Sequence, residues 1–349
     1  MKIKVSKNII KRITSFVASD IWKNQNPNSK TQYWQYHSNL LNKFEISGEH
    51  IEINGIGGFD IPNEKYSFNA MTRPLKNLIK NVFYKQKSRH LSFEDAFQKI
   101  VNENKIGKDK GVKFDKKKIF ASNYSEIKEI YPFNYNVYHP NIILSYYYIN
   151  ILNSYIDFSK AKYVAEIGGG SGNLISLLKH HNKIKCMIDI DLPEMLLVCI
   201  VFLTKVFPEA KVLFPHEIDN KVTKNTLLNY DFIFLAPSQI HLLEDNLFDL
   251  FINTISFQEM QKNQIKQYFD LVQRAGKKDS YFFIQNRLEK KPIDVRGNID
   301  PNDPEKVKSL RFFEYPFFDN EIIIFEECRF SSLVKKAKIY TRLEKILKN

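Results

Sequence analysis

The sequence predicts an α/β fold built on a mostly parallel, doubly wound sheet. From residue 161 onward, short apolar runs alternate with helix-compatible segments, as is typical of strand–helix–strand units in a parallel sheet. The first of these runs leads into the glycine-rich stretch YVAEIGGGSGNL at 163–174. A strand, a tight glycine turn and a helix start, in that order, bring bare backbone and a helix N-terminus up to a bound ligand.

The composition fits a folded protein with a basic surface. The 349 residues are 43% hydrophobic and 14% aromatic, enough to bury a sizeable core. The formal net charge is +13, and a basic balance can indicate nucleic-acid or membrane contact. Because Lys is interspersed along the whole chain, we expect a solvated basic surface and no nucleic-acid groove. A small-molecule or glycan acceptor on an anionic carrier is compatible with this charge.

The cysteines and the apolar runs bear on location. Cys186, Cys199 and Cys328 are dispersed and lack CxxC spacing, which argues against disulfides or structural zinc and favours a reducing compartment. The N-terminus lacks the apolar segment of a secretory signal. The longest apolar run, 195–203, is too short to span a bilayer. We therefore predict a cytoplasmic location and no membrane span.

A charge-rich, glycine-containing stretch at 102–118 marks a boundary in the chain. We expect residues 1–120 to form a mixed, mainly helical N-terminal extension and residues 121–349 to form the α/β domain. Within the extension, 8–20 has the spacing of an amphipathic helix, and 49–54 alternates as a short strand. A role for the extension as a lid or as a homodimer interface is an analogy with other additions to such domains.

The elements of the α/β domain follow in a regular order. An aromatic helix at 142–158 precedes the first strand and either packs on the sheet or covers the ligand. Apolar runs predict strands at 162–167, 184–190, 211–215, 231–237, 248–257, 281–287 and 321–327. Helices are predicted at 173–181, at 193–206 with Pro193 in its first turn, and as a basic terminal helix at 333–347.

Two cofactor classes combine such a turn with an acidic residue on the second strand. A dinucleotide-binding turn needs G-x-G-x-x-G, but Ser171 and Asn173 stand where its glycines should be. Asp191, or alternatively Asp189, supplies a carboxylate that can accept the ribose hydroxyls about 20 residues after the turn. The turn itself reads Glu-x-Gly-x-Gly-x-Gly, with Glu166, Gly168, Gly170 and Gly172. This order resembles the first motif of the class I S-adenosylmethionine-dependent methyltransferases.

Further strings narrow the resemblance. IDLPEMLLVCIVFLTKVFP, FIFLAPSQI, FDLFINTISFQEM and RFFEYPF together resemble the sugar O-methyltransferase family, a bacterial group within that class. The resemblance implies a Rossmann-like class I methyltransferase fold with an antiparallel late strand. It also implies methyl transfer from S-adenosylmethionine to a hydroxyl of a sugar or glycan precursor, as in polysaccharide biosynthesis.

The resemblance assigns roles position by position. Glu166 and the alternating glycines would frame the methionine part of the cofactor, and Asp191 would hold the ribose, with Leu192 along its edge. The adenine would lie against the exit of the 231–237 strand, or alternatively against 215–217. The adenine-flanking residues would be Ser238, Gln239 and Ile240. Asn253 and Thr254 would face the sulfonium, and Ser256, Gln258 and Glu259 would lie on the substrate side.

The acceptor hydroxyl needs help to lose its proton, from a general base or a metal ion. Many plant-type O-methyltransferases of this class place a His after the fourth strand, but Gln258 stands there in this chain, followed by Glu259. Glu259 is one candidate base, and His139 and His241 are the others. No His, Asp or Glu cluster has metal-ligand spacing, so no metal-binding residues are predicted. A divalent ion held by residues distant in sequence stays open.

The sequence is also compatible with other functions. The enzyme could methylate another small molecule or a protein side chain. A binding protein that has the fold without the activity is a second class, and the absent His is the observation in its favour. A nucleic-acid methyltransferase would fit the charge, but NTISFQEM at 253–260 differs from the Asp/Asn-Pro-Pro-Tyr string that amino-methylating enzymes of nucleic acids carry.

Overall fold

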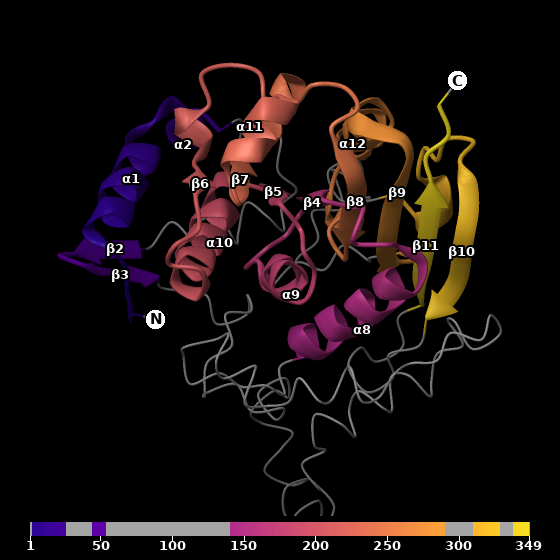
Figure 1. The fold of residues 1–349 in the computed structure, drawn as a ribbon, viewed down its shortest axis with the longest axis horizontal. Helices are drawn as coiled ribbons and strands as arrows, with labels where there is room; N and C mark the ends of the chain where they lie inside the picture. The colour runs from indigo at the N-terminus through magenta and orange to yellow at the C-terminus, as the bar shows by residue number, and fades with distance from the viewer. Residues whose placement is uncertain (1, 26–43, 54–139, 290–309, 329–337, 349) are drawn as a thin grey trace, which may run out of the picture.

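The computed structural model describes residues 2–25, 44–53, 140–289, 310–328 and 338–348. A sheet of eight strands lies at the centre of the described part (Figure 1). Its strands are β4 (Tyr163–Ile167), β5 (Cys186–Ile190), β6 (Val212–Leu213), β7 (Phe232–Leu235), β8 (Phe248–Thr254), β9 (Gly276–Arg287), β10 (Glu321–Cys328) and β11 (Ile339–Lys345).

The strand order confirms the predicted fold class. The strands lie in the order β10-β11-β9-β8-β4-β5-β7-β6. Every pair from β9 to β6 is parallel, whereas β11 is antiparallel to both of its neighbours. The sheet is therefore mostly parallel with one reversed late strand among the described residues, which is the Rossmann-like class I methyltransferase fold.

The predicted terminal helix at 333–347 is wrong, because β11 occupies residues 339–345. Along β11, Ile339, Thr341 and Leu343 are buried, while Tyr340 and Arg342 between them are partly exposed. That alternation has the period of two of a strand. The basic residues nearby suggested an exposed helix, but β11 lies between two strands.

Two hydrophobic cores lie on the two faces of the sheet. On one face, Val164, Met187 and Leu250 pack with the helices α8 (Pro140–Tyr155), α9 (Asn173–His181) and α10 (Pro193–Val206). On the other face, Ala165 and Ile188 pack with α11 (Lys224–Asn229) and α12 (Lys262–Ala275), neither of which the sequence analysis predicted. Neighbouring residues of a strand thus enter opposite cores, and the sheet is doubly wound.

The helices α9 and α10, which follow β4 and β5, begin and end where the sequence predicts. Gly172 caps α9 in the left-handed conformation, with φ of 81°, and Pro193 is the first residue of α10. The aromatic helix α8 packs on the sheet, where Tyr148 is 4% exposed and lies 5.9 Å from Phe283, ring centre to ring centre. These contacts support packing as the role of its aromatic residues. A lid role for α8 stays a prediction.

The described N-terminal residues pack onto the α/β domain. They form a three-stranded antiparallel sheet, β1 (Lys2–Lys4), β3 (His50–Ile53) and β2 (Phe44–Ser47), and the helices α1 (Lys7–Ala18) and α2 (Asp20–Lys23). The predicted helix and strand are thus present. Arg12 of α1 donates two hydrogen bonds to Glu217, at 2.7 and 2.6 Å, and Phe16 is fully buried. The predicted boundary at residue 120 lies outside the described residues and stays a prediction.

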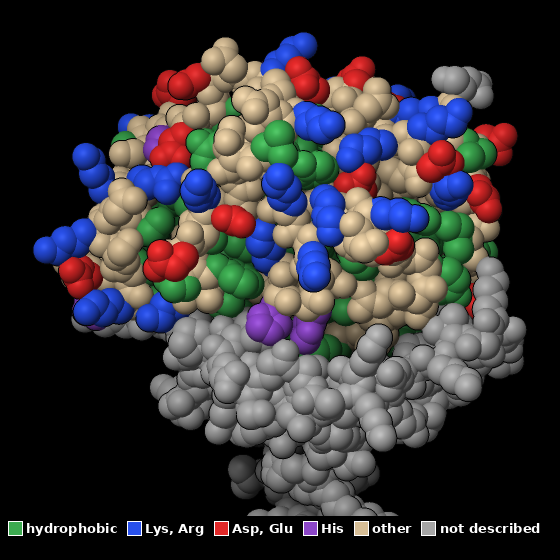
Figure 2. All heavy atoms as spheres, in the orientation of Figure 1, with side chains coloured by type: hydrophobic (Ala, Val, Ile, Leu, Met, Phe, Trp, Pro, Cys, Tyr) green, Lys and Arg blue, Asp and Glu red, His purple; other side chains and the backbone are tan. Residues whose placement is uncertain are grey.

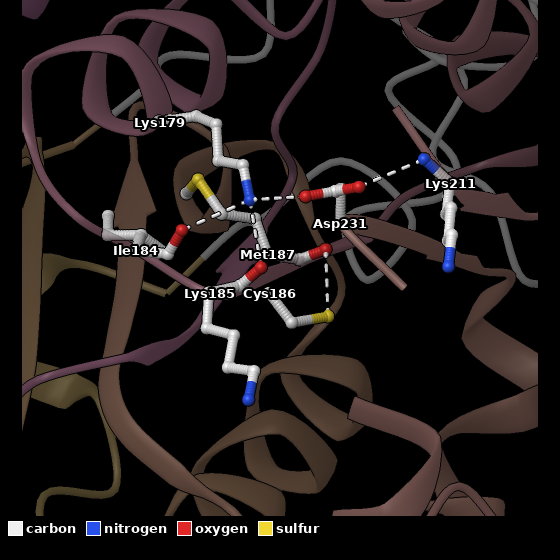
Figure 3. Close-up of polar contacts among 7 residues, drawn as sticks. All are labelled: Lys179, Ile184, Lys185, Cys186, Met187, Lys211 and Asp231. Atoms are coloured by element: carbon white, nitrogen blue, oxygen red, sulfur yellow. Dashed lines mark hydrogen bonds and ion pairs between the residues drawn. The ribbon is translucent and has the colours of Figure 1, made fainter. Parts of the chain in front are cut away.

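An ion-pair network closes the amino end of the parallel strands (Figure 3). The Lys179 Nζ donates to Asp231 Oδ1 at 2.9 Å and to the carbonyls of Ile184 and Lys185. The second oxygen of Asp231 accepts from the backbone N–H of Lys211 at 2.9 Å. These charges hold loops together at one edge of the sheet. The ligand-binding edge of an open α/β sheet is the opposite one, at the carboxyl ends of the strands.

The surface of the described residues is basic but mixed. On the face drawn in Figure 2, Lys and Arg side chains are spread over the surface with Asp and Glu among them. This distribution agrees with the expected solvated surface. Among the described helices, none has the length and apolarity needed to cross a membrane.

Candidate active site

The glycine turn follows β4 and has the backbone that its sequence pattern predicts. Gly168, Gly170 and Gly172 have φ of 77°, 61° and 81°, a region that side chains with a Cβ rarely adopt. Gly169 is needed for a different reason. A Cβ on Gly169 would lie 2.5 Å from Asp189 Oδ1, so only glycine allows the turn to approach that carboxyl group.

Three backbone N–H groups dock the turn on the end of β5. The Gly168 N–H donates to the carbonyl of Ile190 at 2.8 Å. The Gly169 N–H donates to Asp189 Oδ1 at 3.2 Å, and the Gly170 N–H donates to Asp191 Oδ2 at 2.9 Å. The turn and the acidic end of β5 therefore form one unit.

Two of the acidic residues at this junction are buried side by side. Glu166 on β4 and Asp189 on β5 are register partners, and each is 1% exposed. Glu166 Oε2 and Asp189 Oδ2 have no hydrogen-bond partner among the described residues. Burial, followed by the charge of Asp191, raises the pKa of Glu166 to about 8. Burial, followed by the charges of Asp191 and Glu166, raises the pKa of Asp189 well above its ordinary value.

Asp191 lies one residue beyond the end of β5, whereas Asp189 lies within the strand beneath the turn. This difference makes Asp191 the carboxylate at the strand exit, as preferred from the sequence. Its Oδ1 accepts from the N–H of Leu192 at 2.7 Å. Burial raises the pKa of Asp191 to about 7, against the lowering effect of these backbone donors, and the charges of Glu194 and Glu259 add to the rise.

The exit of β8 contacts the glycine turn from the other side. Asn253 Nδ2 donates to the carbonyl of Ile167 at 2.9 Å and to Ser256 Oγ at 2.5 Å. The Ser256 hydroxyl itself donates to the Ile167 carbonyl at 3.0 Å. A Cβ on Gly168 would lie 2.3 Å from Ser256 Oγ. Asn253 and Ser256 therefore hold the turn in place, and the ligand contacts expected of them from the sequence stay a prediction.

Gln258 is also tied into the protein interior. It is 2% exposed, and its Oε1 accepts from the backbone N–H of Arg287 at 2.9 Å. Asn286 joins this arrangement, since its Nδ2 donates to Asn253 Oδ1 at 2.7 Å and its Oδ1 accepts from the Gln258 N–H at 3.3 Å. Sequence reasoning missed Asn286. A polar residue inside the apolar strand YFFIQNR was the signal that could have revealed it.

Glu259 ends the short 3-10 helix η4 (Phe257–Glu259), which begins just after β8. Its side chain is partly exposed, and its negative charge contributes to the raised pKa of Asp191. Thr254 is also partly exposed at the strand exit. Between them, Ile255 has φ of 59°, a costly conformation for a β-branched residue. The chain thus turns sharply where β8 meets the predicted acceptor side.

The two alternative adenine segments lie next to each other. The 3-10 helix η3 (Pro237–Leu242) follows β7, and β7 pairs with β5. The 3-10 helix η2 (Pro215–Glu217) follows β6, and Gln239 Nε2 of η3 donates to the Pro215 carbonyl at 2.8 Å. Gln239 is buried and Ile240 packs on the core, while Ser238 is exposed.

The two described candidate bases lie on different elements. Glu259 lies on the β8 exit near Asp191, whereas His241 is exposed on η3. His139 lies outside the described residues. Within the described ranges, His, Cys, Asp and Glu form no group of three or more that could hold a metal ion.

No protein-family model and no curated protein matches this sequence. Solved structures with a similar chain course include the PH0226 protein from Pyrococcus horikoshii OT3, with 14% identity, a TM-score of 0.42, and coverage of 64% of this chain and 100% of that one. Another is a phosphoethanolamine N-methyltransferase 2 from Haemonchus contortus in complex with S-adenosylhomocysteine, with 11% identity, a TM-score of 0.38, and coverage of 74% and 60%.

A third is CrArsM, an arsenic (III) S-adenosylmethionine methyltransferase from Chlamydomonas reinhardtii, with 15% identity, a TM-score of 0.33, and coverage of 54% and 64%. Methyltransferases thus recur among the similar structures, with different substrates. The similarity values carry neither a substrate nor a site residue over to this chain. The chemistry of the site rests on the geometry of this chain's own residues.

Proposed function

We propose that this protein is an S-adenosylmethionine-dependent methyltransferase. The observation that carries the proposal is the junction of the glycine turn with buried carboxyl groups. Three acidic residues, Glu166, Asp189 and Asp191, meet the turn at the carboxyl edge of the sheet, and two of their oxygens lack a partner among the described residues. A buried acidic group is costly without a compensating positive charge. S-adenosylmethionine carries a sulfonium, an ammonium and one carboxylate, so its methionine end has a net positive charge.

The residues present fit that donor. Asp191 at the strand exit would accept from the ribose hydroxyls, with Leu192 beside it, while the glycine backbone would lie beneath the methionine part. The adenine would lie against η3 at Ser238 and Ile240, because β7 is the strand next to β5. When bound, the donor supplies an activated methyl group on a positively charged sulfur.

A dinucleotide fits the same turn less well. Its pyrophosphate would approach the backbone N–H groups at the glycine turn. Here those N–H groups already donate to Asp189 and Asp191, and the nearby charges are acidic. An anionic ligand would add repulsion where a cationic one adds attraction. The electrostatics therefore agree with the failed dinucleotide spacing at Ser171 and Asn173.

Glu259 is the proposed general base. Methyl transfer is an in-line displacement, so this chain has to align the acceptor oxygen and remove its proton. Glu259 sits near Asp191 at the exit of β8, on the side where the acceptor would approach. Gln258 is bound to β9, and Asn253 and Ser256 hold the turn. Their proposed contribution is to position η4 and the turn, with Thr254 on the sulfonium side.

We propose a hydroxyl of a sugar or glycan precursor as the acceptor, on the strength of the family resemblance over about residues 130–330. The test is transfer of a labelled methyl group from S-adenosylmethionine to a panel of free sugars, nucleotide-linked sugars and small phenols. Label in a sugar, lost when Glu259 is replaced by Gln, supports the proposal. Label only in non-sugar acceptors would support the wider class of small-molecule methyltransferases.

A protein that binds the donor without turnover is the second candidate. It is favoured by Gln258, which stands in the expected position of a catalytic His and is sequestered by Arg287. Donor binding combined with no label transfer to any acceptor class would favour this candidate. We also propose a homodimer, which analytical sedimentation tests. A covering role for residues 1–120 is a further proposal, which a variant lacking those residues tests.

A further inference from the structure

We propose that Glu166 and Asp189 act as one carboxyl pair that attracts the cationic methionine end of the donor and gives up a shared proton when the donor binds. The inference rests on the proposed function and deepens it. It adds Asp189, which had no role beyond an alternative to Asp191, to the donor site. It also states what selects a positively charged donor.

The geometry of the sheet places the two carboxyl groups together. Glu166 and Asp189 are register partners on adjacent parallel strands. Each follows by two residues a neighbour, Val164 and Met187, that belongs to the core under α9 and α10, so both side chains point to that face. Strands in a sheet lie about 4.8 Å apart, and like charges directly opposite each other are destabilising. Two ionised carboxylates in this position would repel strongly, so we expect one proton to be shared between them.

Among the described groups that act on the pair, none is a cation that could relieve this repulsion. The charged and titratable groups that the structure places around it are Tyr148 from α8, Cys199 from α10, Tyr268 from α12 and Asp191 at the exit of β5, with Glu194 and Glu259 beyond Asp191. All are neutral or acidic. The raised pKa of Glu166, about 8, agrees with a pair that holds a proton at neutral pH.

The glycine backbone of the turn lies directly against Asp189, with no side chain of the turn between them. Asp189 Oδ1 accepts from the Gly169 N–H at 3.2 Å, and a Cβ on Gly169 would almost touch it, at 2.5 Å. A cation bound over the turn would therefore interact strongly with the pair, because both carboxyl groups are buried. An opposite charge within roughly 4–6 Å favours the ionised carboxylate. The charge of the pair then changes from −1 to −2, and the proton leaves to the buffer.

Calorimetry measures that proton directly. The donor is titrated at pH 7 in two buffers of different ionisation enthalpy, PIPES and Tris, and the difference in heat gives the protons released. The same titration with 5′-deoxy-5′-methylthioadenosine is the reference, because it carries the adenosine part without ammonium or sulfonium. Both ligands bring the ribose to Asp191, so the part of its titration that the ribose causes is common to both, and the double variant below isolates the part that belongs to the pair. We expect S-adenosylmethionine to release about one proton more than the reference.

Two variants assign the proton. In the double variant Glu166→Gln with Asp189→Asn, the extra proton should be lost and the donor affinity should fall at least tenfold. Glu344→Gln is the matched control. Glu344 is also 1% exposed with a raised pKa, but it lies on β11 with Asn320 and Arg342 as partners. This control should keep the extra proton.

The wild-type comparison can overturn the proposal even where the double variant fails to fold. Equal proton release by the two ligands would overturn the carboxyl pair and leave the proposed function standing, because the donor would still bind. Loss of the extra proton in Glu344→Gln would also contradict the assignment. Absence of donor binding would overturn both.

Discussion

Glu166 and Asp189 lie opposite each other on adjacent parallel strands, each with one carboxyl oxygen that has no partner among the described residues. Their position directly beneath the glycine turn links the sheet, the turn and the charge of the ligand. Parallel strands bring their carboxyl ends to one edge, so residues far apart in sequence meet there. The acidic junction is therefore a consequence of the topology, and we propose that it selects a cationic ligand.

The ligand-free protein should lose stability as the pH rises from about 5 to about 8. The pKa of Glu166 is raised from its ordinary value of 4.5 to about 8 in the folded protein, so folding takes up a proton between these values. The stabilisation is complete below the lower pKa and is lost through the upper one, by at most about 1.4 kcal/mol per pH unit. Urea unfolding at pH 6, 7 and 8 measures it. Glu166→Gln should flatten the dependence; an unchanged slope in that variant would assign the effect to other groups.

Replacing Asp191 by Asn should weaken donor binding about tenfold or more, because a carboxylate acceptor for the ribose hydroxyls is lost. The isosteric change keeps the shape of the β5 exit. Calorimetry of the donor measures the effect. Asp231→Asn is the control, since Asp231 pairs with Lys179 at the amino end of the strands. It should lower the free energy of unfolding and leave the affinity intact. Equal affinity in Asp191→Asn and wild type would exclude the ribose role.

Gly170→Ala and Gly48→Ala should cost similar stability but differ in binding. Their φ angles are 61° and 60°, and neither has an atom closer than 3.9 Å to a new Cβ. Each substitution should therefore add backbone strain and lower the free energy of unfolding by only about 1 kcal/mol. Gly170 lies in the glycine turn, where the new methyl group would occupy space proposed for the methyl donor, whereas Gly48 lies in the β2–β3 turn. Donor affinity should fall in Gly170→Ala alone. A matching fall in both variants would point to a global effect of lost stability.

Glu259→Gln should reduce methyl transfer by about 100-fold or more, the usual contribution of a general base, with donor affinity within about twofold of wild type. His241→Ala should leave turnover nearly unchanged, because His241 is exposed on η3. Steady-state rates and calorimetry on the same preparations separate the two effects. If His241→Ala is the variant that loses turnover, the assignment of the base moves to η3.

The sequence predicted the elements whose boundaries have local chemical causes. Gly172 in the left-handed conformation starts α9, and Pro193 starts α10. The alternating glycines likewise specify their own backbone. The N-terminal helix α1 is present for the same reason, since its apolar residues between 8 and 18 follow helical spacing. Local signals of this kind need no knowledge of the rest of the fold.

The features that local sequence patterns do not reveal depend on distant partners. The charged residues of β11 predict an exposed helix, whereas pairing with β9 and β10 buries alternate positions of a strand. Asn253, Ser256 and Gln258 have polar side chains that fit a ligand site equally well. Their use inside the protein depends on Asn286 and Arg287 of β9, about 30 residues away in the chain. Sequence spacing cannot show which way such side chains point.

Calorimetric titration of the ligand-free protein with S-adenosylmethionine and, separately, with NAD tests the central claim most directly. The carboxyl groups at the glycine turn favour a cationic ligand, so S-adenosylmethionine should bind at one site per chain with micromolar or tighter affinity, and NAD should give no binding heat. Binding of NAD with no binding of S-adenosylmethionine would contradict the methyl-donor site.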